Sequence, residues 1–114
     1  MKKVQGRKPT KKTDKELWTL IAEKINGGEY IFLSHAKKRQ KDRQITDIDV
    51  LDILENKGNR RRRRNKSKDS YTKGYQDWNY CVEGNALSGK EKLRIIISFD
   101  NQAMLVITVI RLGV

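Results

Sequence analysis

The chain is short and strongly basic. It has 114 residues and a mass of 13.3 kDa, which suffices for one domain of ordinary size but not for two independent cores. Lys and Arg number 26 against 14 Asp and Glu, so the formal net charge is +12. So large an excess of positive charge favours polyanionic partners, with nucleic acid first and an anionic membrane surface or an acidic protein second.

Composition excludes a membrane-spanning protein and a disulfide scaffold. The mean hydropathy is −0.82, and the longest apolar run, from Met104 to Ile110, is far shorter than the roughly 20 residues of a membrane-spanning helix. Cys81 is the single cysteine and His35 the single histidine, which argues against a zinc site as well. We therefore expect no metal, no other cofactor and no membrane partner. Because residues 1–12 lack the apolar segment of a signal peptide, we also expect a cytoplasmic location.

The first residues predict a basic arm followed by a helix. Residues 1–12 have no apolar period and predict a disordered arm, which leaves 13–114 as a single domain. Thr13 and Glu16 have the spacing of a capping box, so a helix is expected to begin there. It is expected to end at the Asn-Gly-Gly of 26–28.

Two further helices are expected before the middle of the chain. The short apolar stretch 30–33 is either a strand or the approach to the second helix. Ser34 is a candidate N-cap for that helix, which consists of strong helix formers. Thr46 and Asp49 predict the start of a third helix, which ends near Asn56.

The second half of the chain predicts strands. Trp78, Tyr80 and Val82 alternate with polar neighbours, as in a half-buried strand. The runs 92–99 and 103–111 are apolar on nearly every residue, which is typical of central strands covered on both faces. We expect an α+β fold in which two or three N-terminal helices pack on a three- to four-stranded antiparallel sheet.

Five consecutive arginines follow the third predicted helix. Their guanidinium groups repel one another, and phosphate is the anion that best offsets this repulsion. In an edge strand, alternate arginines would form one row at a spacing of about 6.5–7 Å, comparable to the phosphate repeat of a nucleic-acid strand. The alternatives are a solvated loop or an edge strand whose charges prevent aggregation. We favour nucleic-acid binding by Arg60, Arg61, Arg62, Arg63 and Arg64.

The single histidine lies at the predicted start of the second helix, among basic residues. The helix dipole favours the neutral imidazole of His35 there, and Arg39 and Arg43 follow on the same face. A neutral histidine beside guanidinium groups suits RNA cleavage by the 2′-hydroxyl, because it transfers a proton while the arginines stabilise the phosphate. Lys37 and Lys38 would bind nucleic acid. On the residues alone, a helix-start histidine beside a solvated basic face is the simpler interpretation.

Aromatic residues and one acid in the second half carry weaker signals. Tyr71 and Tyr75 lie near basic residues, where aromatic rings can stack on bases, although a structural role is equally expected. Trp78 and Tyr80 are expected in the core or on a sheet face. Glu83 is a candidate general base, but a cross-strand ion pair is the simpler interpretation.

Three strings of residues carry a resemblance to a known family. They are SHAKKRQKDRQITDIDVLDIL from Ser34, YCVEGNALSGKEKLRIIISF from Tyr80, and VITVI from Val106. They resemble a bacterial family of small domains of unknown function with an HAxxRxxxR motif, which is similar to the BrnT and RelE toxins. The resemblance covers about residues 29–112. Ser34 directly precedes His35, whereas the family pattern has one residue between the two.

The resemblance implies an RNA-cleaving, toxin-like fold with a sheet that carries helices on one side. His35, Arg39 and Arg43 match the motif, and Arg94 falls at a strand position of the family. The resemblance therefore implies that these four residues are catalytic, with His35 transferring a proton and the arginines holding phosphate. It also implies an antitoxin protein as a partner.

We therefore expect a RelE- or BrnT-like protein that binds RNA or the ribosome and acts as a metal-free endoribonuclease. Two alternatives stay open. A non-enzymatic nucleic-acid-binding module would bind with a steep salt dependence and yield no product. A basic protein that docks an acidic antitoxin would form a stoichiometric complex and have little affinity for nucleic acid at physiological salt.

Overall fold

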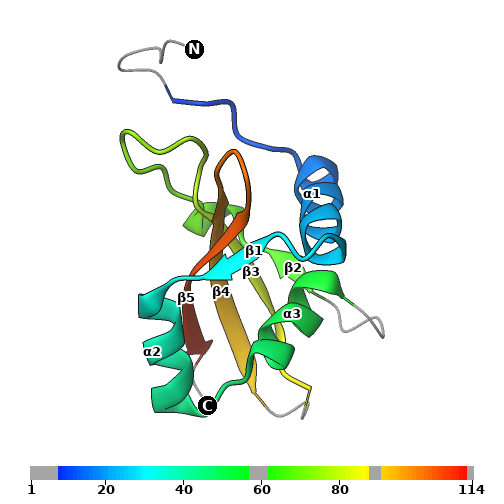
Figure 1. Cartoon of the computed structure of the whole chain (residues 1–114), viewed down its shortest axis with the longest axis vertical. Helices are drawn as coiled ribbons and strands as arrows, with labels where there is room; N and C mark the ends of the chain where they lie inside the picture. The colour runs from blue at the N-terminus through cyan, green and yellow to red at the C-terminus, as the bar shows by residue number, and fades with distance from the viewer. Residues whose placement is uncertain (1–7, 57–61, 88–90, 113–114) are drawn as a thin grey trace.

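Helices and strands form a single α+β fold within the part of the chain that the structure describes. The structure is a computed structural model, which describes residues 8–56, 62–87 and 91–112. Its elements are α1 (Asp14–Asn26), β1 (Tyr30–Phe32), α2 (Ser34–Arg43), α3 (Asp47–Glu55), β2 (Arg63–Arg64), the short 3₁₀ helix η1 (Lys66–Lys68), β3 (Tyr80–Asn85), β4 (Lys92–Phe99) and β5 (Met104–Leu112). The α+β class predicted from the sequence is confirmed (Figure 1).

The sheet is mixed and has five strands in the order β1-β5-β4-β3-β2. β3, β4 and β5 form the expected antiparallel meander. β1 pairs parallel to β5, with Tyr30 opposite Met104, and β2 adds a short antiparallel edge beside β3. The prediction of a three- to four-stranded antiparallel sheet is therefore wrong in strand number and in the direction of one strand. β1 and β2 have three and two residues, too few for a visible alternation.

The predicted helix starts are confirmed in their main features. The Thr13 backbone N–H donates to Glu16 Oε1 at 2.8 Å, and the Glu16 backbone N–H donates to Thr13 Oγ1 at 3.2 Å, which closes the expected capping box. Thr46 and Asp49 form a second box at the start of α3. The N-cap of α2 is Leu33 rather than Ser34, which is the first helical residue.

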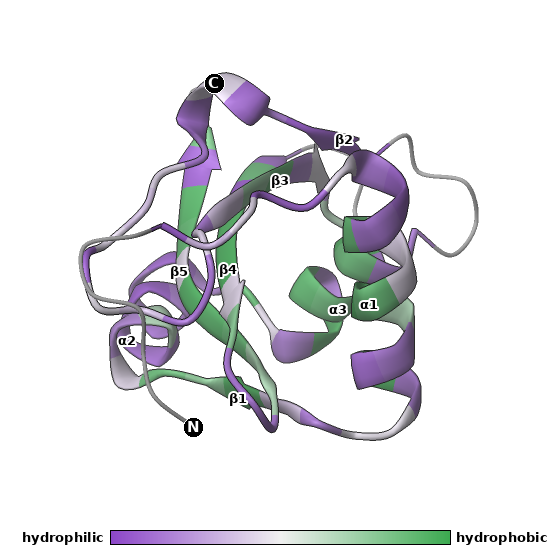
Figure 2. Ribbon diagram, turned by 90° about the horizontal axis from the view of Figure 1, so that it is seen from above, coloured by the Kyte–Doolittle hydropathy of each residue, from purple (hydrophilic) through white to green (hydrophobic). Residues whose placement is uncertain are grey.

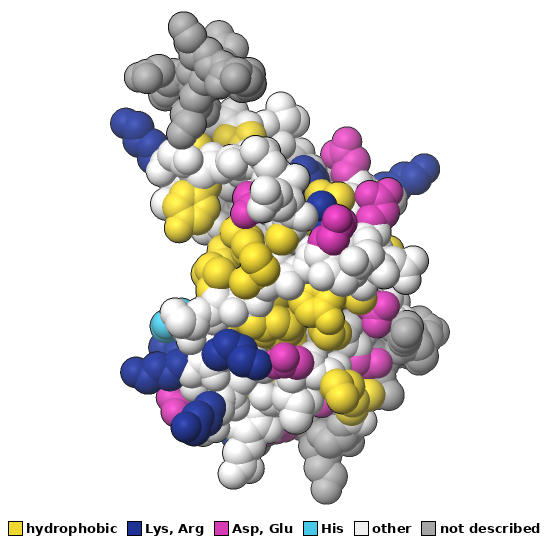
Figure 3. All heavy atoms as spheres, viewed as in Figure 1, with side chains coloured by type: hydrophobic (Ala, Val, Ile, Leu, Met, Phe, Trp, Pro, Cys, Tyr) yellow, Lys and Arg dark blue, Asp and Glu magenta, His cyan; other side chains and the backbone are white. Residues whose placement is uncertain are grey.

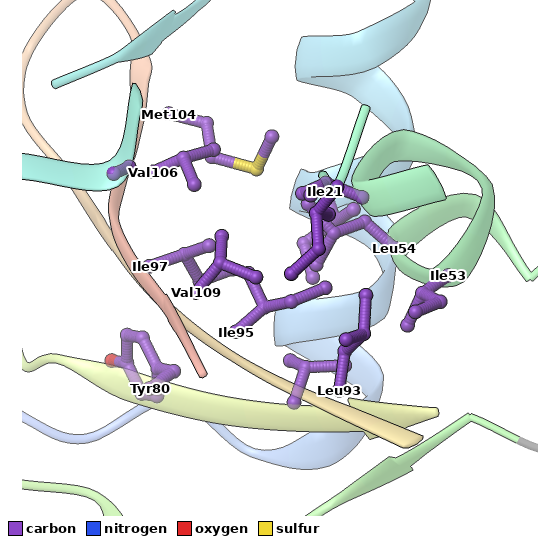
Figure 4. Packing of buried hydrophobic residues seen from close by; sticks show 14 of the residues in the cluster. Ile21, Ile53, Leu54, Tyr80, Leu93, Ile95, Ile97, Met104, Val106 and Val109 are labelled. Atoms are coloured by element: carbon purple, nitrogen blue, oxygen red, sulfur yellow. The ribbon is translucent and has the colours of Figure 1, made fainter. Parts of the chain in front are cut away.

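The core lies between the sheet and two of the helices. In Figure 2, α1 and α3 lie together over one face of the sheet. Ile21 and Leu54 project from these helices toward Ile95 and Val109 of the sheet (Figure 4), and all four side chains are buried. A Cβ atom on Gly84 would lie 2.8 Å from the Ile53 side chain, so only glycine lets α3 approach β3 this closely.

The second helix packs along β5. In both views, α2 lies beyond β5 on the side away from α1 and α3 (Figures 1 and 2). Its small residue Ala36 is fully buried and joins the hydrophobic core, and Gln40, one turn later, is buried too. The Arg111 side chain donates from Nη2 to the Arg43 backbone carbonyl at 2.7 Å, which ties the end of α2 to β5.

The two faces of the sheet differ. Leu93, Ile95 and Ile97 alternate along β4 on the core face. The register places Glu83, Arg94 and Ile110 side by side on the opposite face, where Ile110 is 37% exposed. The expectation that both long strands are covered on both faces is therefore met only in part: α1 and α3 cover one face, and α2 packs along β5 on the other side, but Arg94 and Ile110 stay partly exposed.

Part of the predicted N-terminal arm lies against the sheet. The Trp78 indole Nε1–H donates to the Pro9 carbonyl at 2.8 Å, and the Lys12 backbone N–H donates to the Tyr80 hydroxyl at 3.1 Å. The Lys12 ammonium group lies 2.9 Å from an oxygen of Asp77. The packed part of the chain therefore includes residues 8–12, whereas 1–7 lie outside the described residues.

None of the helices in the described ranges has the length and apolar character that crossing a bilayer requires.

Candidate nucleic-acid interface

Opposite charges separate onto two consecutive helices. α2 carries five cationic side chains against one aspartate, whereas α3 carries four acidic side chains and no basic one. In Figure 3, dark blue Lys and Arg side chains gather beside the cyan histidine at the position of α2, and most magenta Asp and Glu side chains lie toward α1 and α3. A polyanion is therefore attracted to the α2 side of the molecule and repelled from α3.

Three of the predicted catalytic residues form one stripe along α2. His35, Arg39 and Arg43 follow one another at intervals of four residues, which places them along one flank of the helix. His35 and Arg39 are exposed, and Arg43 is half-buried. The helix turns the residue pair Ala36 and Gln40 toward β5, so the stripe lies beside this contact. The structure thus brings the three residues together as the sequence predicted.

The stripe lies on the flank of α2 turned away from α3. Lys37, which is on the opposite flank, places its Nζ 2.8 Å from Asp47 Oδ1 at the start of α3 and 5.4 Å from the centre of the Phe32 ring. This ion pair partly neutralises Lys37, whereas Lys38 and Lys41 are exposed on the outer side of the helix. Lys41 was missed among the predicted binding residues, although its spacing of three residues from Lys38 already places the two on one side.

Arg94, the fourth predicted catalytic residue, lies in a separate cluster. It is on β4, one strand further from α2 than β5, with Ile110 of β5 as its cross-strand neighbour. Its Nε donates to Glu83 Oε2 at 2.9 Å. The structure therefore splits the predicted catalytic set between the flank of α2 and the open face of the sheet.

Glu83 is the centre of that second cluster. The residue is 1% exposed, and its carboxylate accepts hydrogen bonds from Arg63 on β2, from Arg94 on β4 and from the amide of Asn65. Burial alone would raise the pKa of Glu83, but the hydrogen bonds from Asn65, Arg94 and Arg63 outweigh it and lower the pKa to about 2. The cross-strand ion pair predicted from the sequence is confirmed, and the carboxylate is ionised and fully bonded at neutral pH.

Cys81 adjoins this cluster without contributing a reactive group. The thiol is fully buried on β3, and its Sγ lies 3.8 Å from Glu83 Oε2. Burial, as the main cause, and the negative charge of Glu83, as the next, raise the pKa of the Cys81 thiol to about 11. At neutral pH the thiol is protonated and a poor nucleophile. Within the described ranges, no three His, Cys, Asp or Glu side chains gather as a metal site would require.

The low pKa of Glu83 predicts a specific dependence of stability on pH. A carboxylate whose pKa is depressed in the folded state stabilises that state above its unfolded pKa, and the effect is lost as pH falls toward the folded pKa. We expect Glu83→Gln to have a lower free energy of unfolding than the wild type at pH 7, and we expect this difference to shrink from about pH 5 down to pH 2. Urea denaturation across this range measures the difference. A difference that stays constant with pH would contradict the lowered pKa of Glu83.

The arginines of the run that the structure describes mainly contact other residues of the protein itself. Arg60 and Arg61 lie outside the described residues. The Arg62 guanidinium stacks on the Trp18 ring, 4.0 Å from its centre, and donates to the Leu54 carbonyl. The Arg64 side chain is buried on the same side of the sheet. Arg62 and Arg64 thus share a face, as alternation predicts, but this face is turned toward the interior and forms no outward row. Arg63, on the other face, has a side chain that is 61% exposed.

The aromatic residues form a third group, with basic side chains beside them, at the end of the sheet away from α2 (Figure 1). The Tyr71 and Trp78 rings lie 5.9 Å apart, and the Tyr71 hydroxyl donates to the Tyr75 carbonyl at 3.0 Å. The ammonium groups of Lys8 and Lys11 lie 5.2 Å and 4.8 Å from the centre of the Trp78 ring. Tyr75 is 49% exposed, whereas Tyr80 is fully buried, as expected of a core residue.

The comparisons with known proteins identify a family. The family model described as "Domain of unknown function (DUF4258)" matches residues 32–111, a span that starts at the end of β1 and includes α2, α3 and most of the sheet. Neither the curated proteins nor the solved structures gave a match. The match to the family model confirms the prediction that the chain belongs to a family of small domains of unknown function. The chain therefore belongs to the DUF4258 family.

Proposed function

We propose that the chain binds RNA through α2 and cleaves it without a metal ion, in a toxin-like role. The observation that carries this proposal is the stripe on α2, where the exposed His35 lies one helical turn from the exposed Arg39 and two turns from the half-buried Arg43. The same residues match the HAxxRxxxR motif of a family of small domains that resembles the BrnT and RelE toxins, and this resemblance supports the choice of reaction. Similarity of fold alone would not do so.

Affinity for RNA would come from phosphate contacts. Lys38, Arg39 and Lys41 are exposed on one helix and add to the net charge of +12. Such contacts neutralise phosphates and release counterions, so they bind nucleic acid of any sequence and weaken as salt is added. The acidic α3 on the other side of β5 would limit the orientations in which RNA can approach.

Cleavage would use the RNA 2′-hydroxyl as the nucleophile. The 2′-oxygen attacks the adjacent phosphorus and the bond from phosphorus to the 5′-oxygen breaks, which leaves a 2′,3′-cyclic phosphate and a 5′-hydroxyl. His35 accepts the proton of the 2′-hydroxyl, and water supplies a proton to the departing 5′-oxygen. Arg39 and Arg43 stabilise the negative charge on the phosphate oxygens in the transition state.

Two partners fit the same helix. A ribosome would present RNA to α2 in place of free RNA. An antitoxin protein with an acidic surface would cover the cationic residues of α2 and block access to His35, since charge complementarity directs association. The non-enzymatic alternative uses the same surface for binding and differs only in giving no cleavage product.

A charge-removal series tests the binding surface. We expect the variant Lys38→Ala/Arg39→Ala/Lys41→Ala to bind single-stranded RNA more weakly, with a salt dependence of log K reduced by about 0.7 for each phosphate that it no longer neutralises. Lys15→Ala, an exposed substitution on α1, should behave as the wild type. Fluorescence anisotropy at several salt concentrations measures both quantities. An unchanged salt dependence in the triple variant would exclude α2 as the binding surface.

A further inference from the structure

A row of charged residues crosses three strands on the open face of the sheet. The register places Arg63 of β2 opposite Glu83 of β3, and Glu83 opposite Arg94 of β4. Arg63 Nη2 lies 3.2 Å from Glu83 Oε1, and Arg94 Nε lies 2.9 Å from Glu83 Oε2. One buried carboxylate therefore holds two guanidinium groups from the strands on either side of it.

Stability does not explain why the row is charged. A buried ion pair is often no more stabilising than apolar residues of similar size, because the loss of hydration offsets the attraction. Apolar residues fit this face, since Ile96 and Ile110 are on it beside the row. A structural ion pair also needs only one arginine, whereas here two cations share one anion. The cluster thus keeps a net positive charge.

The two arginines retain the capacity to bind an anion. A guanidinium has five N–H donors in a planar fork, and the bonds to Glu83 use one nitrogen of each arginine. The side chain of Arg63 is 61% exposed and that of Arg94 is 23% exposed, so solvent reaches both. Because both guanidinium groups contact the same carboxylate, a single phosphate can reach both, and two-pronged phosphate recognition is the geometry that arginine favours.

We propose that Arg63 and Arg94, positioned by Glu83, form a phosphate-binding site on the open face of the sheet. The identity of the ligand rests on the proposed function: the site binds a backbone phosphate of the RNA that α2 holds. α2 packs along β5, and β5 is the neighbour of β4, so a strand of RNA that leaves α2 crosses β5 before it meets Arg94. The exposed part of Ile110 lies on this path and offers apolar contact to a ribose or base.

Titration with inorganic phosphate and, separately, with pentauridine RNA tests the site by NMR of the arginine Nε–Hε groups. We expect both probes to shift the Arg94 signal. Arg63→Ala should weaken phosphate binding about tenfold, the size expected when one hydrogen bond between charged groups is removed. Arg63 is exposed at the sheet edge, so this variant should keep its fold, which thermal denaturation checks. Lys15→Ala is the matched control, since it removes one exposed charge from α1.

The variant Glu83→Gln tests whether Glu83 aids phosphate binding by holding the two arginines in place, or whether binding depends only on the net positive charge. This variant keeps both arginines and raises the net charge, so attraction alone predicts tighter phosphate binding. Loss of the carboxylate that holds the arginines predicts weaker binding, together with altered Nε–Hε signals of Arg94 before any phosphate is added. Tighter or unchanged binding in Glu83→Gln would overturn the positioning role.

The results distinguish failure of this site from failure of the proposed function. The site is overturned if phosphate and pentauridine leave the Arg94 signal unchanged, or if Arg63→Ala binds phosphate as the wild type does, even when substitutions on α2 still weaken RNA binding. The proposed function fails, and the site stands as one for another phosphate compound, if phosphate shifts Arg94 while RNA binds equally well to the wild type and to the α2 triple variant.

Discussion

Replacing His35 by alanine is expected to lower the rate of RNA cleavage about 10²- to 10⁴-fold, the usual contribution of a general acid or base. The affinity for RNA should change little, because the cationic side chains of α2 remain. The fold should also be unaffected, since His35 is exposed on the first turn of α2. Single-turnover cleavage of an end-labelled RNA in the presence of EDTA measures the rate.

Two further variants make the His35 experiment specific. Arg39→Ala should also slow cleavage, because Arg39 lies in the same stripe, but it should weaken RNA binding as well. Lys15→Ala removes one charge from α1 and should cleave as the wild type does. Cleavage at an undiminished rate by His35→Ala would show that another group, or another protein in the preparation, transfers the proton.

Replacing Arg64 by alanine is expected to destabilise the fold by about 3 kcal/mol, the lower end of the cost of breaking a buried ion pair, because Asp69 keeps the Lys11 ammonium group 3.7 Å away. The Arg64 side chain is 2% exposed, and its Nη2 lies 2.9 Å from an oxygen of Asp69, whose side chain is fully buried. Arg64 also reaches Asp14 of α1 at 2.9 Å and lies 5.1 Å from the centre of the Tyr80 ring. It thus joins β2, α1 and the sheet.

Arg63 provides the matched control for Arg64, since it is the adjacent residue of the same strand. Its own side chain is 61% exposed, and its buried partner Glu83 keeps the hydrogen bonds from Arg94 and Asn65 when Arg63 is removed, so we expect a loss of only about 1 kcal/mol. Urea denaturation at pH 7 should therefore separate Arg64→Ala clearly from Arg63→Ala. Equal losses of stability in the two variants would contradict the structure, in which the Arg64 side chain is buried and the Arg63 side chain is exposed.

The elements that could be predicted from the sequence are those with local signals. The Thr13 and Thr46 boxes mark helix starts within a few residues, and the long apolar runs of β4 and β5 predict strands without a partner being known. What escaped prediction depends on distant contacts. β1 is a strand only because β5, more than 70 positions further along the chain, pairs with Tyr30.

The arginine run shows the same limit for the candidate site. Alternation predicted that Arg62 and Arg64 share a face, but the direction of that face is set by Trp18, Asp14 and Asp69. These partners come from α1 and from the segment after β2. Composition alone assigns such arginines to solvent and to nucleic acid, because it contains no information on which acids are buried nearby.

The α2 stripe and the sheet cluster differ in how much of each was foreseeable. The stripe follows from helical periodicity, which is local, so His35, Arg39 and Arg43 could be grouped in advance. The second cluster requires the register of three strands. A cross-strand ion pair of Glu83 could be anticipated from the sequence. The bond of Arg63 to Glu83 could not, because β2 is only two residues long and leaves no strand pattern in the sequence.

The central claim, that His35 on α2 lets this chain cleave RNA without a metal ion, is tested most directly by product analysis. Purified protein is incubated in EDTA with labelled RNA, both free and bound to ribosomes, and the new ends are identified. We predict fragments with 2′,3′-cyclic phosphate and 5′-hydroxyl ends, which are absent when the substrate lacks 2′-hydroxyls or the protein carries His35→Ala. RNA that stays intact in both forms, or fragments that arise equally with His35→Ala, would contradict the claim.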